Sequence, residues 1–141
     1  MSNRDVIEEW FHKVWTEEDA GTIDRLLISD TNVRGLGEKT RIGPEEFKVF
    51  HAGLLAMVGN ARVDIDKFME DGEWASALCT FRAKRRDNGG DVSISGQVML
   101  QVRDGKIVDA YNHFDFIDLF DQIGLLPDRL MERCMGGEKI G

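Results

Sequence analysis

The hydrophobic pattern of this chain changes its period near residue 60, and that change limits the folds open to it. Before residue 60, large apolar residues recur every three to four positions, as on one face of a helix. After it, apolar and polar residues alternate over about 61–70, 73–85, 91–103 and 106–116, which is typical of strands with one buried face. Helices followed by long strands predict the α+β class, with the helices packed on one face of a sheet.

Short turns join the predicted strands. Asp71-Gly72 and Asp104-Gly105 are Asp-Gly pairs of the kind that closes hairpins, and the loop RDNGGD joins the two middle strands. Strands connected in this way are neighbours and run antiparallel. We therefore predict a four-stranded antiparallel meander, with a further short strand near 31–36. The two glycines of Arg34–Lys39 (RGLGEK) predict a turn after that strand.

Three helices are predicted before the sheet. The first follows a capping pair, Ser2 with Asp5. Its apolar stripe comprises Val6, Ile7, Trp10, Phe11, Val14 and Trp15. Thr22 caps a short second helix that extends to Leu27. The third helix has proline at its first position, acidic residues in its first turn and Gly59 as its stop.

Length and composition indicate one globular unit. The chain has 141 residues, 42% of them hydrophobic and 31% charged, which is enough for one domain spanning 1–141. We expect its core within 5–127, with a final helix near 117–124, and a C-terminal extension over 128–141 that includes another helical turn.

The charge of the chain excludes some partners. The formal net charge is −8 and the isoelectric point is about 4.9, so nucleic acid and anionic membranes are not expected partners. We see no signal peptide and no apolar run of membrane-spanning length. Two distant cysteines, Cys79 and Cys134, fit reduced thiols. These features predict a cytoplasmic protein.

The most specific sequence signal lies at the end of the predicted sheet. DGKIVDAYNHFDFIDLFDQIGLLP, residues 104–127, resembles the close of the last strand in SnoaL-like polyketide cyclases, where DGKIVE-W leads to an Asp and then to QLG-P. The order of helices and meander is similar to the nuclear transport factor 2-like (cystatin-like) superfamily. The resemblance covers about 5–127, and it implies a cone-shaped roll in which helices and a curved antiparallel sheet enclose a pocket.

The same resemblance implies a function. It points to a cofactor-independent enzyme, commonly a homodimer through the sheet, in which an Asp acts as acid and base on a carbonyl substrate. Asp115 falls on the position of that Asp, and Tyr111 on that of a frequent Trp.

The last predicted strand has two chemically different faces. By period two, one face carries Asp109, Tyr111, His113 and Asp115. The other carries Val108, Ala110, Asn112, Phe114 and Phe116. From spacing alone the polar face fits solvent exposure as well as it fits a pocket. With the resemblance added, we expect Asp115 to lie in a pocket.

A carboxylate withdrawn from water has a raised pKa, and that suits a general base near neutral pH. Asp115 would then remove a proton next to a carbonyl, and the enolate would attack within the same molecule in an aldol-type cyclisation. His113, Tyr111 and Gln101 are candidate donors to the enolate oxygen. His113 is also an open candidate for the base, with Asp115 orienting it.

The predicted helices supply further candidates for binding a small hydrophobic ligand. Trp10, Trp15, Phe50 and His51 are candidate wall residues, although aromatic residues on an apolar stripe most often serve as core. The three histidines are dispersed and lack metal-ligand spacing, so we expect no metal and no other cofactor.

Two other functions stay open. A non-catalytic module that binds a small molecule, and a ketosteroid isomerase-like isomerase, are both compatible with this fold, because a fold alone does not fix a function. An Asp115 side chain directed into a closed apolar pocket would favour catalysis. An Asp115 exposed to solvent would favour binding.

Overall fold

The computed structural model describes residues 1–36 and 42–141. Its helices are α1 (Asn3–Trp10), the π-helix η1 (Phe11–Thr16), α2 (Gly21–Leu26), α3 (Pro44–Met57), α4 (Phe116–Gln122) and α5 (Leu130–Met135). Its strands are β1 (Leu27–Arg34), β2 (Val58–Asp71), β3 (Trp74–Arg85), β4 (Asp91–Arg103) and β5 (Lys106–Phe114).

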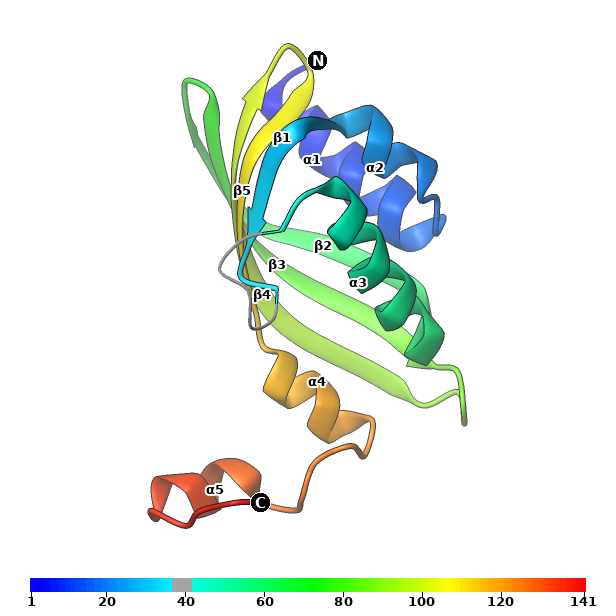
Figure 1. Ribbon diagram of the computed structural model, residues 1–141, viewed down its shortest axis with the longest axis vertical. Coiled ribbons are helices and arrows are strands. Elements are labelled where there is room, and N and C mark those ends of the chain that lie inside the picture. Colours follow the sequence, from blue (N-terminus) through cyan, green and yellow to red (C-terminus); the bar gives the residue numbers. More distant parts are fainter. Residues whose placement is uncertain (37–41) are drawn as a thin grey trace.

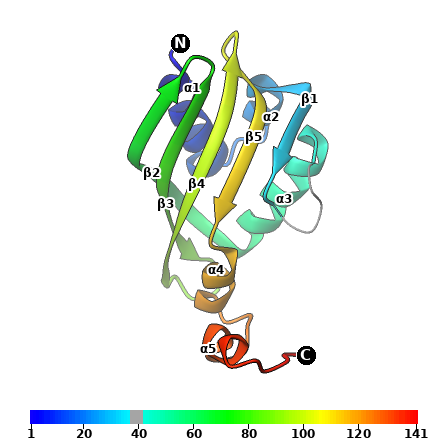
Figure 2. The same cartoon turned by 90° about the vertical axis from the view of Figure 1, so that its left-hand side faces the viewer.

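One curved sheet and a layer of helices make up the body of the protein. The strands lie in the order β1-β5-β4-β3-β2, and α1, α2 and α3 lie on one side of them (Figure 1). Figure 2 shows the strands in front and these helices behind, so the other face of the sheet is uncovered. The expected α+β class, with helices packed on a curved sheet, is confirmed.

The meander forms as predicted, but a fifth strand changes the sheet. β2, β3, β4 and β5 pair with their neighbours antiparallel, whereas β1 pairs parallel with β5, with Val33 opposite Ala110. The short strand expected near 31–36 starts already at Leu27, which we had assigned to a helix. This pairing joins segments separated by α3 and most of the meander, so no local turn signal could reveal it.

The turn residues behave as their chemistry requires. Asp104 and Gly105 have φ angles of 53° and 74°, the left-handed backbone that a tight two-residue hairpin needs at both positions. Gly59, by contrast, does not end α3. The chain passes from Met57 directly into β2, and Gly59 pairs with Lys84, so its expected role as a helix stop is wrong.

The first helix is capped as expected and then widens. The Ser2 hydroxyl accepts a hydrogen bond from the Asp5 N–H, and the Asp5 carboxylate accepts one from the Ser2 N–H. Beyond Trp10 the helix continues as η1, where the Glu17 N–H donates to the His12 carbonyl over five residues at 2.9 Å. A plain helix was predicted here. π-turns of this kind are frequent near functional sites.

Burial follows the pleat of the strands. Along β4, alternate residues from Val92 to Val102 are buried under the helices, and the residues between them are mostly exposed on the uncovered face. We call these the inner and outer faces of the sheet. α5 extends beyond α4, away from the helix layer (Figure 1), and none of its residues is buried.

Two expectations from the sequence complete the fold. α4 covers most of the helix predicted near 117–124, and α5 forms within the predicted extension. The turn predicted at Arg34–Lys39 lies partly outside the described residues. Within 1–36 and 42–141, no helix is long and apolar enough to span a membrane.

Candidate ligand pocket

An apolar pocket lies between the inner face of the sheet and the helices. Its lining residues come mainly from α1, η1, α3, the strands and α4, and all but one are aromatic or aliphatic. Its aromatic wall comprises Trp10, Phe11, Trp15, Phe47, Phe50, Phe81, Phe114 and Phe116. Such a lining is typical of sites that bind small apolar molecules.

The pocket is small as it stands. Its volume is about 50 Å³, whereas a water molecule needs roughly 10–15 Å³ and an apolar cavity of about 150 Å³ holds benzene. Leu36, Phe50, Phe114 and Phe116 are only half-buried, so they form the rim. A ring-sized ligand would therefore enter by moving rim side chains rather than core ones.

The aromatic wall is held together by edge contacts around Trp15. The Trp15 ring lies 6.2 Å from Phe47, 6.2 Å from Phe50 and 6.0 Å from Phe81, measured between ring centroids. Trp10 packs on Phe47 at 5.2 Å. Trp10, Trp15 and Phe50, which the sequence offered as wall residues, thus all line the pocket. Their part in binding stays a prediction.

His51 supports this wall without lining it. It is buried, and its Nε2 lies 2.6 Å from the Val14 carbonyl oxygen in η1. Because a carbonyl only accepts, Nε2 must carry the proton and donate. The imidazole also lies 5.0 Å from the Trp15 ring. His51 therefore anchors the π-turn behind Trp15, and it is not among the lining residues.

A glycine in β4 makes room for one wall residue. Gly96 pairs with Phe114 across β4 and β5, and a Cβ at Gly96 would stand only 2.1 Å from Phe114 Cδ1. The Phe114 ring thus lies directly over the Gly96 backbone. This contact brings Phe114 to the pocket rim beside Phe116, at 6.4 Å between centroids.

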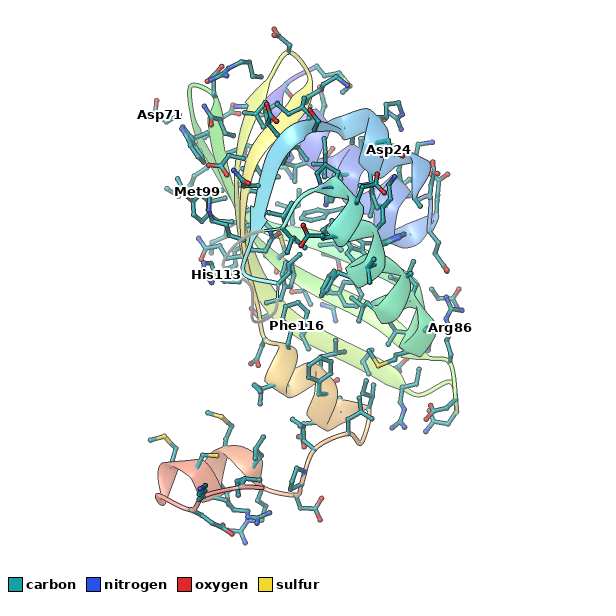
Figure 3. All side chains as sticks on the ribbon, in the orientation of Figure 1. Asp24, Asp71, Arg86, Met99, His113 and Phe116 are labelled. Carbon is teal, nitrogen blue, oxygen red and sulfur yellow. The ribbon has the colours of Figure 1, made fainter. Side chains whose placement is uncertain are left out.

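The polar candidates of β5 lie on the other side of the sheet. Tyr111 and His113 are exposed on the outer face, opposite Met99 and Gln97. Figure 3 shows His113 and Met99 on the side away from α1–α3, whereas Phe116 lies on the helix side. The alternation was predicted correctly from Asp109 to Phe114, but the pocket-lining face is the one with Ala110, Asn112 and Phe114. At Val108 the prediction is wrong, because a register shift between β4 and β5 puts Ile107 on the pocket-lining face instead.

Gln101 shares this outer position. Its Nε2 donates to Glu73 Oε1 at 3.0 Å, and it is not among the pocket residues. Tyr111 contacts the Arg34 guanidinium, 4.4 Å from its ring centroid. The structure therefore keeps Gln101, Tyr111 and His113 together on the outer face and apart from the cavity.

Asp115 is also outside the pocket. Its side chain is exposed and caps α4, with Oδ1 accepting a hydrogen bond from the Asp118 N–H at 3.0 Å. The reason is local, because a helix begins at Phe116 and its free N–H groups need an acceptor that Asp supplies well. The expectation that Asp115 is withdrawn from water is therefore wrong.

With this geometry in place, comparison with known proteins gives the family. The model of the SnoaL-like domain matches residues 7–110. The chain belongs to the SnoaL-like family. The family resemblance seen in the sequence is thus confirmed, although the matched segment ends before Asp115. No curated protein matches the chain.

Solved structures agree with this SnoaL-like assignment at the level of the fold. IdmH from Streptomyces antibioticus, a candidate polyketide cyclase, is 18% identical, with 88% of this chain and 99% of that chain covered and a TM-score of 0.76. AclR from Streptomyces galilaeus, a candidate hydroxylase, is 17% identical, with coverages of 95% and 89% and a TM-score of 0.75. A protein from Catenulispora acidiphila with a ketosteroid isomerase-like fold is 17% identical, with coverages of 89% and 96% and a TM-score of 0.74.

The perturbed ionisable groups of this SnoaL-like domain lie away from the pocket. On the rim of the outer face, hydrogen bonds from Arg103 and Gln101 lower the pKa of Glu73 to about 2. Burial raises the pKa of the Cys79 thiol to about 12, which fits a packing role. Among the described residues, no group of three or more His, Cys, Asp or Glu is placed to hold a metal ion.

One pocket residue of the SnoaL-like domain had no assigned role in the sequence. Asn112 lines the cavity from β5, and its Nδ2 donates to the Arg34 carbonyl at 3.1 Å. The signal was present, because Asn112 is the single polar residue on the apolar face of the last strand. The sequence prediction instead placed the functional groups on the other face, at Asp115 and His113.

Proposed function

We propose that this SnoaL-like domain binds a small, largely apolar molecule in the pocket beneath its helices. The composition of the lining carries the proposal. Within the part of the chain that the structure describes, no lining side chain is Asp, Glu, His, Lys or Arg. Burial of apolar surface is the dominant source of affinity that such a lining offers.

The fold relatives support a ligand-binding role without naming the ligand. The Catenulispora acidiphila protein is described in complex with trimethylamine, a small molecule. IdmH is a candidate polyketide cyclase. The small volume found in this chain favours a compact ligand.

A pocket-filling variant tests the proposal. Ala110 is buried and lines the cavity, so Ala110→Leu places three more carbons where the ligand would lie. Toluene, phenol and benzaldehyde serve as probes, titrated into the protein and followed by chemical shifts of pocket methyl groups. We expect saturable binding to the unmodified chain and at least tenfold weaker binding to Ala110→Leu.

A matched control places the same atoms elsewhere. Ala52 lies on the exposed side of α3, and Ala52→Leu should leave the affinity of each probe unchanged. Equal binding by Ala110→Leu and the unmodified chain would show that the probes bind outside this pocket. The absence of saturable binding by any probe would overturn the proposal.

A second candidate is acid and base catalysis on a carbonyl compound bound in the same pocket, such as an aldol-type cyclisation without metal or cofactor. The likeness of the fold to candidate polyketide cyclases favours it, as does the position of Asp115 next to Phe116 of the lining. Asp115 would have to leave its capping bond to Asp118 in order to reach a ligand.

Turnover separates this candidate from simple binding. Small carbonyl compounds would be incubated with the protein and their products identified by mass spectrometry. Asp115→Asn keeps an oxygen that can cap α4 and removes the base, and His113→Gln tests the other candidate. Loss of product at unchanged affinity in either variant would support catalysis by that residue. Full turnover in both would contradict both assignments.

We further propose that two copies pair through the outer face of the sheet. The middle of this face, on β3, β4 and β5, contains no Lys, Arg, Asp or Glu, and charged residues such as Arg82, Asp64 and Glu73 surround it. Its central residues are Ser76, Leu78, Thr80, Ser95, Gln97, Met99, Tyr111 and His113. A centre depleted of charge inside a charged rim is the usual composition of a protein interface.

Sedimentation of two matched variants tests this pairing. Met99 is 47% exposed in the middle of the outer face, whereas Val49 is 74% exposed on α3. We expect Met99→Glu to convert a dimer into a monomer and Val49→Glu to leave the dimer intact. A monomeric unmodified chain at micromolar concentration, or a dimer unaffected by Met99→Glu, would contradict the proposal.

A further inference from the structure

The pocket has only one side-chain hydrogen-bond acceptor among its described lining residues. Trp10 and Trp15 contribute indole N–H groups, which only donate, and the aliphatic and phenyl side chains contribute neither donors nor acceptors. Asn112 is the remaining lining residue, and its amide oxygen Oδ1 can accept two hydrogen bonds. Selection for a ligand that donates a hydrogen bond therefore depends on Asn112.

The orientation of the Asn112 amide is fixed by its partner. Its nitrogen lies 3.1 Å from the Arg34 carbonyl oxygen, and since that oxygen can only accept, the NH₂ side of the amide must face it. Oδ1 is then left on the other side of the amide, with no donor among the described residues. A flipped amide would place two oxygens together and lose the hydrogen bond.

The backbone around this amide is held on both sides of the sheet. β1 pairs with β5 at Arg34 and Tyr111, and the Arg34 side chain on the outer face forms an ion pair with Asp109 and stacks on Tyr111. Next along the chain, Gly35 has a φ of 91°, and a Cβ there would stand 1.7 Å from the Asn112 carbonyl oxygen. The carbonyl that orients Asn112 is therefore fixed in place.

We infer that the ligand of this pocket carries a hydrogen-bond donor, a hydroxyl or N–H on an otherwise apolar ring or short chain, and that Asn112 Oδ1 accepts it. The inference rests on the proposed binding function and narrows it to a ligand class. An acceptor left unpaired beside a bound apolar ligand lowers affinity. A phenol, an aromatic amine or a small alcohol satisfies it, whereas a hydrocarbon or an aldehyde does not.

A comparison of three probes across one substitution tests the inference. Phenol carries a donor, benzaldehyde carries only an acceptor, and toluene carries neither. Asn112→Leu removes the amide at similar size, and we expect it to lower the ratio of phenol affinity to toluene affinity about tenfold. The ratio of benzaldehyde to toluene should change less than twofold.

A second variant and a measurement on the unmodified chain keep the test decisive even if Asn112→Leu folds poorly. Leu36→Ala alters the rim without touching the amide, so it should change the three affinities by one common factor. In the unmodified chain, phenol should bind more tightly, relative to toluene, than the water-to-cyclohexane partition of the two compounds predicts. This comparison needs no variant and decides the question if Asn112→Leu does not fold.

The outcomes distinguish this inference from the function on which it rests. If toluene binds but the phenol ratio is the same in Asn112→Leu, the donor requirement is overturned and the apolar pocket survives. If Asn112→Leu weakens the binding of benzaldehyde rather than that of phenol, the amide N–H is the selecting group. The proposed ligand class is then wrong. If no probe binds the unmodified chain, the proposed function fails, and the donor requirement fails with it.

Discussion

Along β4, the inner face presents Val92, Ile94, Val98 and Leu100, whereas the outer face presents Ser93, Ser95, Gln97 and Met99. The two faces are built from alternating residues of the same strands, but only the inner one is covered by helices (Figure 2). The inner face therefore holds the pocket. The outer face holds Tyr111 and His113, which the sequence offered as donors to the substrate, with His113 also a candidate base. In this domain, the face that carries the titratable side chains of β5 is therefore not the face that lines the cavity.

Two tryptophans, one on each side of the sheet, provide the largest test of this difference. Trp15 is 8% exposed and contacts four rings, so Trp15→Ala should lower the free energy of unfolding by about 3–5 kcal/mol. Trp74 lies on the outer face against Tyr111, and Trp74→Ala should cost about 1 kcal/mol or less. Urea unfolding measures the free energy lost in each variant. Equal losses in the two variants would contradict the difference in burial between the inner and outer faces.

Two neighbouring residues of β4, Gly96 on the inner face and Ser95 on the outer face, test the same difference between the faces with a much smaller change. Gly96→Ala places a Cβ 2.1 Å from Phe114 Cδ1, so the ring must move, at a cost of about 1–3 kcal/mol. Ser95→Ala, one residue away on the outer face, should change the free energy of unfolding by less than about 0.5 kcal/mol. Unfolding of the two variants in urea gives both values, and a neutral Gly96→Ala would show that Phe114 does not lie over β4.

The cap of α4 tests whether Asp115 has a structural role. Asp115→Ala removes the acceptor of the Asp118 N–H and should cost about 1 kcal/mol, while Asp115→Asn should cost only a few tenths. Asp121 is exposed later in the same helix, so Asp121→Ala serves as the control without a cap. Thermal unfolding of the three variants ranks their losses of stability, and we expect the largest loss in Asp115→Ala. A loss as large in Asp115→Asn as in Asp115→Ala would indicate a role for the charge itself.

The smallest expected effect is a pH dependence on the outer rim. The pKa of Glu73 is lowered from 4.5 to about 2, first by its hydrogen bonds to Arg103 and then by Gln101. A lowered folded-state pKa contributes stability above the unfolded value, and that contribution is lost as pH falls from about 5 to about 2. Glu73 is exposed, so the effect is small and weakens with salt.

Two variants isolate that contribution. Glu73→Gln should flatten the acid side of the stability profile between pH 5 and about 2. Glu70→Gln, an exposed change in the preceding strand, should leave the profile parallel to that of the unmodified chain. Urea midpoints at several pH values measure the profiles, and identical slopes for all three proteins would contradict the pairing of Glu73 with Arg103.

Local patterns in the sequence predicted most of the fold. The hairpin turns, the capping pair at Ser2 and the alternation of β3, β4 and the second half of β5 each depend on neighbouring residues, so the sequence reveals them directly. The parallel pairing of β1 with β5 depends on residues far apart in the chain. The π-turn of η1 depends partly on His51, which comes from another helix. Neither could be predicted from spacing.

The candidate site was predicted less well for a related reason. Period two separates Asp115 and His113 from Asn112 and Phe114, but it does not say which set faces the helices. That choice is made by the tertiary packing of α1–α3. Trp10, Trp15 and Phe50 were found because apolar helix stripes must face the core. Asn112 could have been found by asking which polar residue interrupts the buried face.

The central claim is that the ligand pocket opens onto the inner face of β5. The most direct test is to measure nuclear Overhauser effects between bound toluene and carbon-13-labelled protein. We predict contacts to the Ala110 and Leu100 methyl groups and to the Phe114 ring, all of which line the cavity. Contacts instead to the Tyr111 and His113 rings would place the ligand on the outer face and contradict the account.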